Sequence, residues 1–179
     1  MIYFTSDLHL GHRAIIRMTG RPFLDVTEMN ETLIKRYNDR VHADDTVYLL
    51  GDLSFRIPVE EANALIARLN GNKIFIAGNH DAQYRRDLFT DVGDYKAVGL
   101  DGFYWVMMHY PLADWNRKFH GAIDLHGHCH GHKEDNEKNR HDGLLRYDVG
   151  VDANDFAPVS IVEIEKFFFL RNGIPHSGD

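Results

Sequence analysis

Cysteine is almost absent from this chain: Cys129 is the single one among 179 residues, so no intramolecular disulfide can form. A chain without disulfides suits a reducing compartment. Long apolar runs are also missing, since none approaches the roughly 20 residues that a membrane-spanning helix needs. No signal segment is recognisable before the first polar motif at residue 7. We therefore expect a cytoplasmic protein that does not use a membrane.

An excess of positive charge is missing as well. The chain has 20 Lys and Arg against 27 Asp and Glu, and its formal net charge is −7. A surface that holds a long nucleic acid needs clustered Lys and Arg, so such a partner is not expected. A nucleotide or a nucleic-acid end stays open, because bound cations can reverse the local field. The length and the 44% hydrophobic content suit one globular domain over residues 1–179.

Apolar runs that resemble buried strands alternate with segments of helical periodicity, which is typical of α/β proteins. The expected strands are residues 2–6, 46–50, 73–77, 95–98, 103–108, 122–126 and 147–151. The expected helices are residues 12–18, a segment opening at 27, one after 58, 82–89, and one from 160 to 172–173. Residues 131–146 carry almost no apolar side chains, so we expect a solvated surface loop there.

Polar residues with the chemistry of metal ligands follow five of these apolar runs. In an open α/β sheet, ligands bind in the loops at the carboxyl ends of the strands. Oxygen and imidazole ligands gathered at one such edge can hold two divalent cations. The five blocks are Asp7-Leu8-His9, Gly51-Asp52, Gly78-Asn79-His80-Asp81, His109 and Gly127-His128-Cys129-His130.

The spacing within two blocks predicts which side chains point toward the metals. Side chains two residues apart on a strand point to the same face, so Asp7 and His9 could bind one cation while Leu8 enters the core. The same rule puts the two histidines of residues 128–130 on one side. It puts Cys129 on the other, as a buried small hydrophobic residue rather than a thiolate ligand.

The blocks at residues 51–52 and 78–81 supply further functions. The carboxylate of Asp52 has two oxygens that can bridge a pair of cations, and Asn79 offers a neutral carbonyl oxygen. His80 can stand over the metals as a catalytic group without ligating them, with Asp81 placed to orient its imidazole. Each residue alone could be a helix cap or a turn residue. Five such strand ends together make that interpretation improbable.

Other polar residues near the blocks are candidates for contact with substrate. His12 follows His9 by three residues and could line the cleft, and Arg13 or Arg17 could hold a phosphate. An exposed helix face is the alternative for both arginines. Hydrogen bonding within turns explains Asp148 and Asp152 more simply than a third metal does.

Taken together, the five blocks resemble the calcineurin-like metallophosphoesterase superfamily. They occur in order over residues 7–130. Two further segments resemble sequences of its small phage and bacterial members: Arg21-Pro22-Phe23 and Gly150-Val151-Asp152-Ala153-Asn154. The resemblance implies a four-layer αββα sandwich with the metal site at the carboxyl ends of the strands. It implies one cation on Asp7, His9, Asp52 and His130, and a second on Asp52, Asn79, His109 and His128.

The resemblance implies a dinuclear phosphoesterase that hydrolyses phosphomonoesters or phosphodiesters, of small molecules or nucleotides, by attack of a metal-bridging hydroxide. Mixed nitrogen and oxygen ligation suits Mn, Fe, Zn, Ni or Co. We expect two divalent cations, with Mn²⁺ as the first candidate. After Gly51-Asp52 the chain continues Leu53-Ser54-Phe55-Arg56, without the phosphate-binding arginine of the large protein-phosphatase branch, so folded phosphoproteins are not an expected substrate. The alternative is a scaffold of the same fold without activity. The complete 78–81 block, with its non-ligand His80, favours the enzyme.

Overall fold

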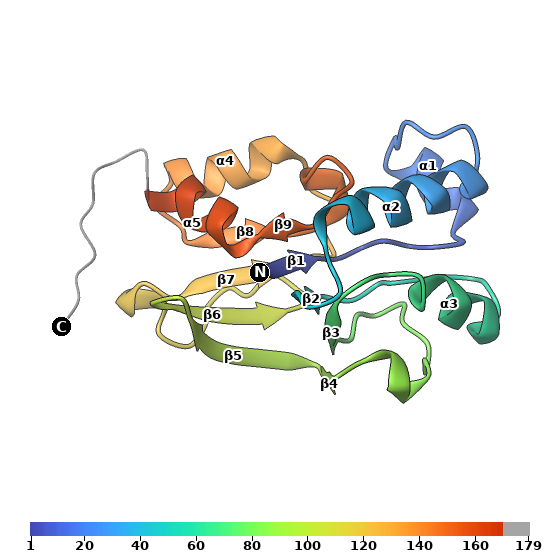
Figure 1. Ribbon diagram of the computed structural model, residues 1–179. Helices are drawn as coiled ribbons and strands as arrows, with labels where there is room; N and C mark the ends of the chain where they lie inside the picture. The colour runs from blue at the N-terminus through green and yellow to red at the C-terminus, as the bar shows by residue number, and fades with distance from the viewer. Residues whose placement is uncertain (170–179) are drawn as a thin grey trace.

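The computed structural model describes residues 1–169, which form two β-sheets flanked by helices (Figure 1). The first sheet has the strand order β4-β3-β2-β1-β9, and the second has the order β5-β6-β7-β8. The strands of the first sheet are β1 Ile2–Thr5, β2 Thr46–Leu49, β3 Asn72–Ile76, β4 Asp91–Gly93 and β9 Val159–Ser160. Those of the second are β5 Tyr95–Leu100, β6 Phe103–Met108, β7 Ile123–His126 and β8 Arg146–Asp148.

Parallel pairing dominates both sheets. Strands β1 to β4 run parallel, and β9 pairs antiparallel with β1. In the second sheet β6, β7 and β8 are parallel, and β5 pairs antiparallel with β6. The turn between β5 and β6 places Asp101 and Gly102 at φ 52° and 84°, which is the left-handed geometry of a tight hairpin. The carboxyl ends of the parallel strands therefore gather at one edge of each sheet.

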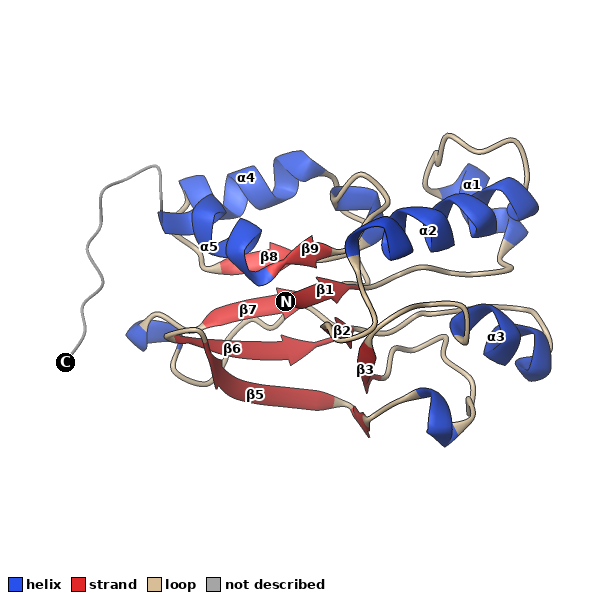
Figure 2. Ribbon diagram, in the orientation of Figure 1, coloured by secondary structure: helices blue, strands red, loops and turns tan. Residues whose placement is uncertain are grey.

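The described helices are α1 Arg13–Met18, α2 Val26–Arg40, α3 Val59–Ile66, α4 Lys133–His141 and α5 Ile161–Phe169 (Figure 2). Helix α2 begins at an N-cap: Asp25 Oδ1 accepts from the backbone N–H of Thr27 at 2.8 Å and of Glu28 at 2.9 Å. Helix α5 has the expected reciprocal cap between Ser160 and Glu163. Its expected end at 172–173 lies outside the described residues. None of the helices within residues 1–169 has the length and apolar character needed to cross a membrane.

Alternating side chains of the central strands fill two separate apolar layers. Phe4, Tyr48 and Trp105 meet between the two sheets, and the ring of Phe4 lies 5.4 Å from Tyr48 and 5.5 Å from Trp105. Val47 and Leu49 point to the opposite face, where they pack with α2. The outer face of the second sheet is covered by residues around Trp115. The expected sandwich of two sheets with flanking helices is confirmed.

Two expectations about local structure are wrong. Residues 82–89 form only a short 3₁₀ turn, Arg86–Leu88. The residues before this turn are held by distant parts of the chain instead of by a helix: Oδ1 of Asn63, for example, accepts a hydrogen bond from the backbone N–H of Arg85. Residues 131–146 contain α4 instead of a loop. Its single buried residue, Asn136, exchanges two hydrogen bonds with the backbone of Asp148, which anchors this polar helix to β8. Neither contact is visible in local periodicity.

Candidate metal centre

The proposed metal ligands come together at the carboxyl ends of five strands. Asp7 follows β1, Asp52 follows β2, Asn79 follows β3 and His109 follows β6. The block at 128–130 follows β7. The backbone joins these loops directly, since Asp7 N donates to the carbonyl of Gly51 at 3.0 Å. The convergence expected from parallel strands is therefore present.

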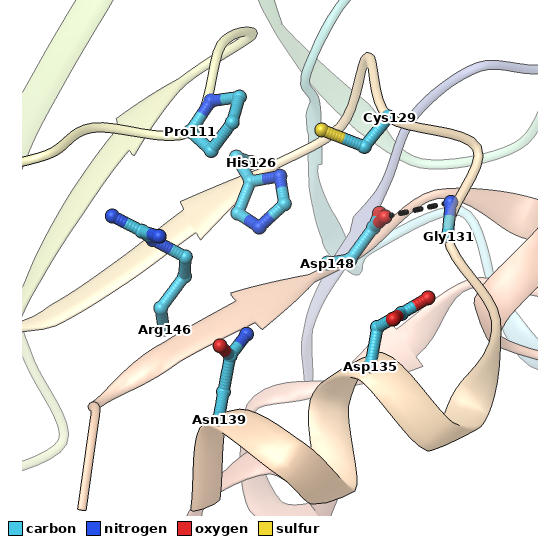
Figure 3. A pocket seen from close by; sticks show the side chains of 8 residues that line it. All are labelled: Pro111, His126, Cys129, Gly131, Asp135, Asn139, Arg146 and Asp148. Carbon is cyan, nitrogen blue, oxygen red and sulfur yellow. Dashed lines mark hydrogen bonds between the residues drawn. The ribbon is translucent and has the colours of Figure 1, made fainter. Parts of the chain in front are cut away.

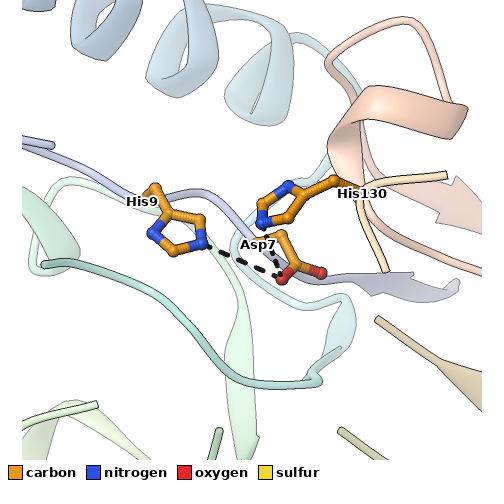
Figure 4. A group of neighbouring side chains, drawn as sticks. All are labelled: Asp7, His9 and His130. Atoms are coloured by element: carbon orange, nitrogen blue, oxygen red, sulfur yellow. Dashed lines mark ion pairs between the residues drawn. The ribbon is translucent and has the colours of Figure 1, made fainter. Parts of the chain in front are cut away.

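One group that could hold a cation consists of Asp7, His9 and His130 (Figure 4). Oδ1 of Asp7 lies 4.0 Å from Nε2 of His9 and 3.9 Å from Nε2 of His130. Burial raises the pKa of Asp7 to about 7 despite the opposing charge of His130. A bound cation would favour the ionised carboxylate.

A second group surrounds Asp52 and His109, with Asp7 also within reach. Oδ1 of Asp52 lies 3.6 Å from Nε2 of His109, and Oδ2 lies 3.4 Å from Nε2 of His9. The carbonyl oxygen of Asn79 lies 3.0 Å from Nε2 of His109 and 3.0 Å from Nδ1 of His128. The seven expected ligands thus form one continuous cluster, with Asp52 between its two halves.

The donor set fits divalent cations. Both ring nitrogens of His9 are buried and have no hydrogen-bond partner within residues 1–169, although such groups are normally satisfied. Burial, helped by the positive charges of His130 and Arg21, lowers the pKa of His9 to about 2, so its imidazole is neutral. Nδ1 of His109 donates to the carbonyl of Leu50 at 2.8 Å, which leaves the Nε2 lone pair facing the cluster. Neutral imidazoles and carboxylates are the ligands that transition metals take.

The backbone of the ligand loops is not strand-like. Five of the expected ligands have positive φ angles, between 47° and 70°: Asp7, His9, Asp52, His128 and His130. Non-glycine residues seldom adopt this conformation, and its cost is tolerated mainly at functional sites. Leu8 is buried in the core as expected. Cys129 is exposed, so the expectation of a buried residue is wrong: strand alternation does not extend through left-handed residues.

Two glycines are required by close approach of these loops. A Cβ on Gly51, whose φ is 89°, would lie 2.6 Å from Nδ1 of His109. A Cβ on Gly78 would lie 2.7 Å from the backbone N of Asp52 and closer still to its carboxylate. Both positions therefore exclude any side chain.

His80 lies beside the cluster, and no hydrogen bond within residues 1–169 joins its imidazole to Asp81. The carboxylate of Asp81 is surrounded by four other donors: the backbone N–H groups of Asp52, Leu53 and Gly78 and the hydroxyl of Tyr84, at 2.7 to 2.9 Å. Those contacts join the loops after β2 and β3, and they leave no carboxylate edge for the imidazole. The exposed ring of His80 packs instead 4.2 Å from the ring of Phe55 and 5.7 Å from that of His9.

The two expected substrate-contacting residues lie in different environments. His12 is buried, with its ring 5.3 Å from that of His9 and 4.9 Å from that of Phe55. Burial lowers the pKa of His12, and the positive charge of Arg56 lowers it further. Arg13 is exposed, and no polar contact within residues 1–169 joins it to the cluster. An exposed cation nearby is Arg56, whose guanidinium carbon lies 5.1 Å from the ring centre of Phe55.

A buried ion pair beside the cluster escaped the sequence analysis. Arg21 binds Asp152 through Nε at 2.9 Å and Nη2 at 2.8 Å, and Nδ1 of His130 lies 2.9 Å from Oδ2 of Asp152. The interpretation of Asp152 as a turn residue is therefore wrong. Asp148 does support its loops, accepting from the backbone N–H of Gly150 at 2.7 Å. In the sequence, the only sign of this pair was that the segments containing Arg21 and Asp152 both resembled small members of the superfamily.

A pocket of about 390 Å³ lies behind the 128–130 loop (Figure 3). Its carboxylates are already bound: Asp148 accepts from the backbone of Gly131 at 3.2 Å, and Asp135 caps α4. Arg146, on the same wall, pairs with Asp124 at 3.1 Å. The pocket is lined by Pro111, His126, Cys129, Gly131, Asp135, Asn139, Arg146 and Asp148.

Several known proteins are similar to this chain over most of its length. The protein-family model described as calcineurin-like phosphoesterase matches residues 1–175. An uncharacterised protein from Methanocaldococcus jannaschii is 34% identical over 166 residues, covering 92% of this chain and 89% of its own. The Gene 66 protein of Mycobacterium phage L5 is 31% identical, covering 84% and 86%. The crystal structure of a protein of unknown function from Aquifex aeolicus superposes with a TM-score of 0.75 at 26% identity, covering 93% of this chain and 98% of that one.

Proposed function

The chain belongs to the calcineurin-like phosphoesterase family, and on that premise we propose that it is a metal-dependent hydrolase of phosphomonoesters or phosphodiesters. The substrate would be a small molecule or a nucleotide, in keeping with a net charge of −7 that does not suit long nucleic acids. We further propose a dinuclear site, with Mn²⁺ as the first metal to test and Fe, Zn, Ni or Co as alternatives.

The position of Asp52 carries this proposal. Its Oδ2 lies 3.4 Å from Nε2 of His9 and its Oδ1 lies 3.6 Å from Nε2 of His109, so each oxygen faces a different half of the cluster. A carboxylate in that position suits a ligand shared by two cations. One cation would be held by Asp7, His9, Asp52 and His130, and the other by Asp52, Asn79, His109 and His128.

The protein prepares these ligands before any cation binds. When bound, two divalent cations supply Lewis-acid chemistry: they lower the pKa of water and draw charge from phosphoryl oxygens. The chain contributes orientation. The Leu50 carbonyl holds His109 with its Nε2 lone pair toward the cluster, and the buried His9 stays neutral, with one ring nitrogen free of a proton.

His80 would act on the substrate as a catalytic residue. Its backbone N–H donates to Oδ1 of Asp52 at 3.0 Å, which ties the residue to the centre of the cluster while its side chain stays exposed. From there the imidazole could donate a proton to the leaving oxygen or a hydrogen bond to the phosphoryl group. Phe55, in contact with this ring, would position it.

Arg56 and His12 would bind the anionic substrate. Arg56 is exposed, has φ 59°, and places its guanidinium over Phe55 beside His80. The buried ring of His12 lies 4.9 Å from the ring of Phe55, so His12 would line the same part of the site. An arginine suits phosphate because its donors match the oxygens in pairs.

The first test is hydrolysis of p-nitrophenyl phosphate and bis-p-nitrophenyl phosphate by Mn²⁺-loaded protein, with Asp52→Asn as the matched variant. Turnover of the diester that disappears in Asp52→Asn would support the shared site and a diester substrate. Turnover of the monoester alone would direct the search to small phosphatase substrates. Two bound Mn²⁺ ions with no turnover of either ester would contradict the proposal and favour a binding scaffold of the same fold.

A further inference from the structure

We propose that Arg21 and Asp152 are positioning residues of the metal site: together they select the tautomer of His130 that can ligate a cation and hold the Asp7 loop against it. The inference rests on the proposed function only for the assignment of His130 and Asp7 as metal ligands. It concerns two residues whose side chains lie outside the ligand set, and it predicts an effect on one cation rather than on both.

The contact between Asp152 and His130 sets the tautomer. Oδ2 of Asp152 lies 2.9 Å from Nδ1 of His130, and a carboxylate there can only accept, so Nδ1 carries the proton. In the neutral ring the Nε2 lone pair is then free, and Nε2 is the nitrogen that faces Oδ1 of Asp7 at 3.9 Å. A neutral histidine binds a metal through an unprotonated nitrogen, so this hydrogen bond prepares the ring as a ligand.

Arg21 fixes Asp152 and the Asp7 loop at the same time. Two of its N–H groups hold the Asp152 carboxylate, Nη2 also donates to the carbonyl of Asp7 at 2.7 Å, and Nη1 donates to that of Leu8 at 3.1 Å. The remaining N–H faces Sδ of Met29 at 3.6 Å. All five N–H donors of the guanidinium therefore have acceptors. A lysine could not make the same set of contacts, because its ammonium group has only three donors.

The carbonyls that Arg21 binds belong to a backbone in an unfavourable conformation. Asp7 and His9 have φ angles of 56° and 49°, and the carbonyls of Asp7 and Leu8 lie within this turn. Such conformations persist only where surrounding contacts determine them. Arg21 supplies two of these contacts from a side chain that is 0% exposed. One guanidinium thus connects the loop of Asp7 with the support of His130.

A purely structural ion pair is the competing explanation, and the chain contains a matched control. Asp124 in β7 pairs with Arg146 in β8 at 3.1 Å, and its side chain is also 0% exposed. This pair contacts none of the seven expected ligands. Losing a buried partner should cost stability in either pair, but only the Arg21–Asp152 pair should affect metal binding.

The experiment compares Asp152→Asn, Arg21→Lys and the control Asp124→Asn with the wild type. The ¹⁵N shifts of the imidazoles in metal-free protein report the tautomer of His130, assigned with a His130→Asn variant. Titration with Mn²⁺, followed by calorimetry, reports the affinity of each site. Thermal unfolding of the metal-free proteins measures how much stability each substitution removes.

At a pH where the His130 ring is neutral, we expect metal-free wild type to carry its one proton on Nδ1. In Asp152→Asn, an amide that turns its NH₂ toward the ring shifts the proton to Nε2, and one Mn²⁺ binds about 10–100-fold more weakly. The second Mn²⁺ should bind with unchanged affinity. Arg21→Lys should weaken the same Mn²⁺, while Asp124→Asn should lower thermal stability alone.

Two results would overturn the inference. A neutral wild-type His130 with its one proton on Nε2 would do so even if no variant folds. Equal Mn²⁺ affinities in Asp152→Asn, Arg21→Lys and Asp124→Asn would show that both pairs are merely structural. Neither readout involves ester hydrolysis, so an inactive protein with two normal Mn²⁺ sites would contradict the proposed function alone.

Discussion

The aromatic ring of Phe55 lies 4.2 Å from the imidazole of His80, at an interplanar angle of 43°. This contact takes the place of the hydrogen bond from His80 to the Asp81 carboxylate that the sequence suggested. An aromatic neighbour restricts the ring by packing and leaves both of its nitrogens available. His80 can therefore face a substrate while the backbone of its loop stays attached to Asp52.

His80→Ala should lower kcat for the better of the two chromogenic esters by about 10²–10⁴-fold, because a proton donor or hydrogen-bond donor to the reacting group is lost. Bound Mn²⁺ should stay unchanged, since the imidazole is not a proposed ligand. Phe55→Ala should lower kcat less, and the double variant should be no slower than His80→Ala if Phe55 acts only through this ring. Steady-state kinetics with metal analysis checks these outcomes; loss of Mn²⁺ in His80→Ala would contradict the assignment.

Arg56→Ala should raise KM for the phosphate ester by about tenfold, which corresponds to about 1.4 kcal/mol for one charge-assisted contact to the substrate. The matched control is Arg13→Ala, because Arg13 is also exposed but has no contact with the cluster within the described residues. Its KM should not change. If Arg13→Ala raised KM and Arg56→Ala did not, the original sequence prediction would be right and the structural reassignment wrong.

Gly78→Ala should disrupt the centre, because the added methyl group meets the backbone and carboxylate of Asp52. We expect a loss of about 1–3 kcal/mol of unfolding free energy and weaker Mn²⁺ binding. Gly99→Ala is the control, since its methyl group would come no closer than 4.0 Å to the carbonyl oxygen of Phe103. Urea unfolding and Mn²⁺ titration test the pair. Normal metal binding by Gly78→Ala would show that the two loops can separate at no cost.

Acid should destabilise the metal-free protein through His9. The folded-state pKa of about 2 lies below the ordinary value of 6.5, so below pH 6.5 the unfolded chain binds a proton that the folded chain does not. The contribution of His9 is therefore complete above pH 6.5 and decreases as the pH falls, by at most about 1.4 kcal/mol per pH unit.

His9→Gln lacks this titration, so the difference in unfolding free energy between wild type and His9→Gln isolates it. Urea unfolding at pH 7.5 and at pH 5 measures that difference without metal. We expect wild type to lose more stability than His9→Gln as the pH falls. An equal loss in both proteins would mean that His9 is accessible to protons in the folded state.

Local patterns predicted much of the fold because burial imposes a period on the chain. The apolar face of α2, with Met29, Leu33 and Tyr37, is buried as its spacing indicated, and the central strands lie within one or two residues of their predicted positions. The exceptions are segments whose structure depends on distant partners. Helix α4 has few apolar residues of its own and is anchored by Asn136, and residues 82–85 are held by contacts such as Asn63 with Arg85.

By itself, the sequence determined which residue types stand at the ends of the strands. Parallel strands bring their carboxyl ends to one edge of a sheet, which places Asp7 and Asp52 together, and the packing of the second sheet brings His109 to them. Only the tertiary structure decided how these side chains are oriented and supported. The left-handed backbone at the ligands leaves Cys129 exposed. The Asp81 carboxylate accepts hydrogen bonds from four donors other than His80. Arg21 binds Asp152, which is 131 residues away in the sequence. Such contacts depend on the packing of several loops, and no local period in the chain encodes them.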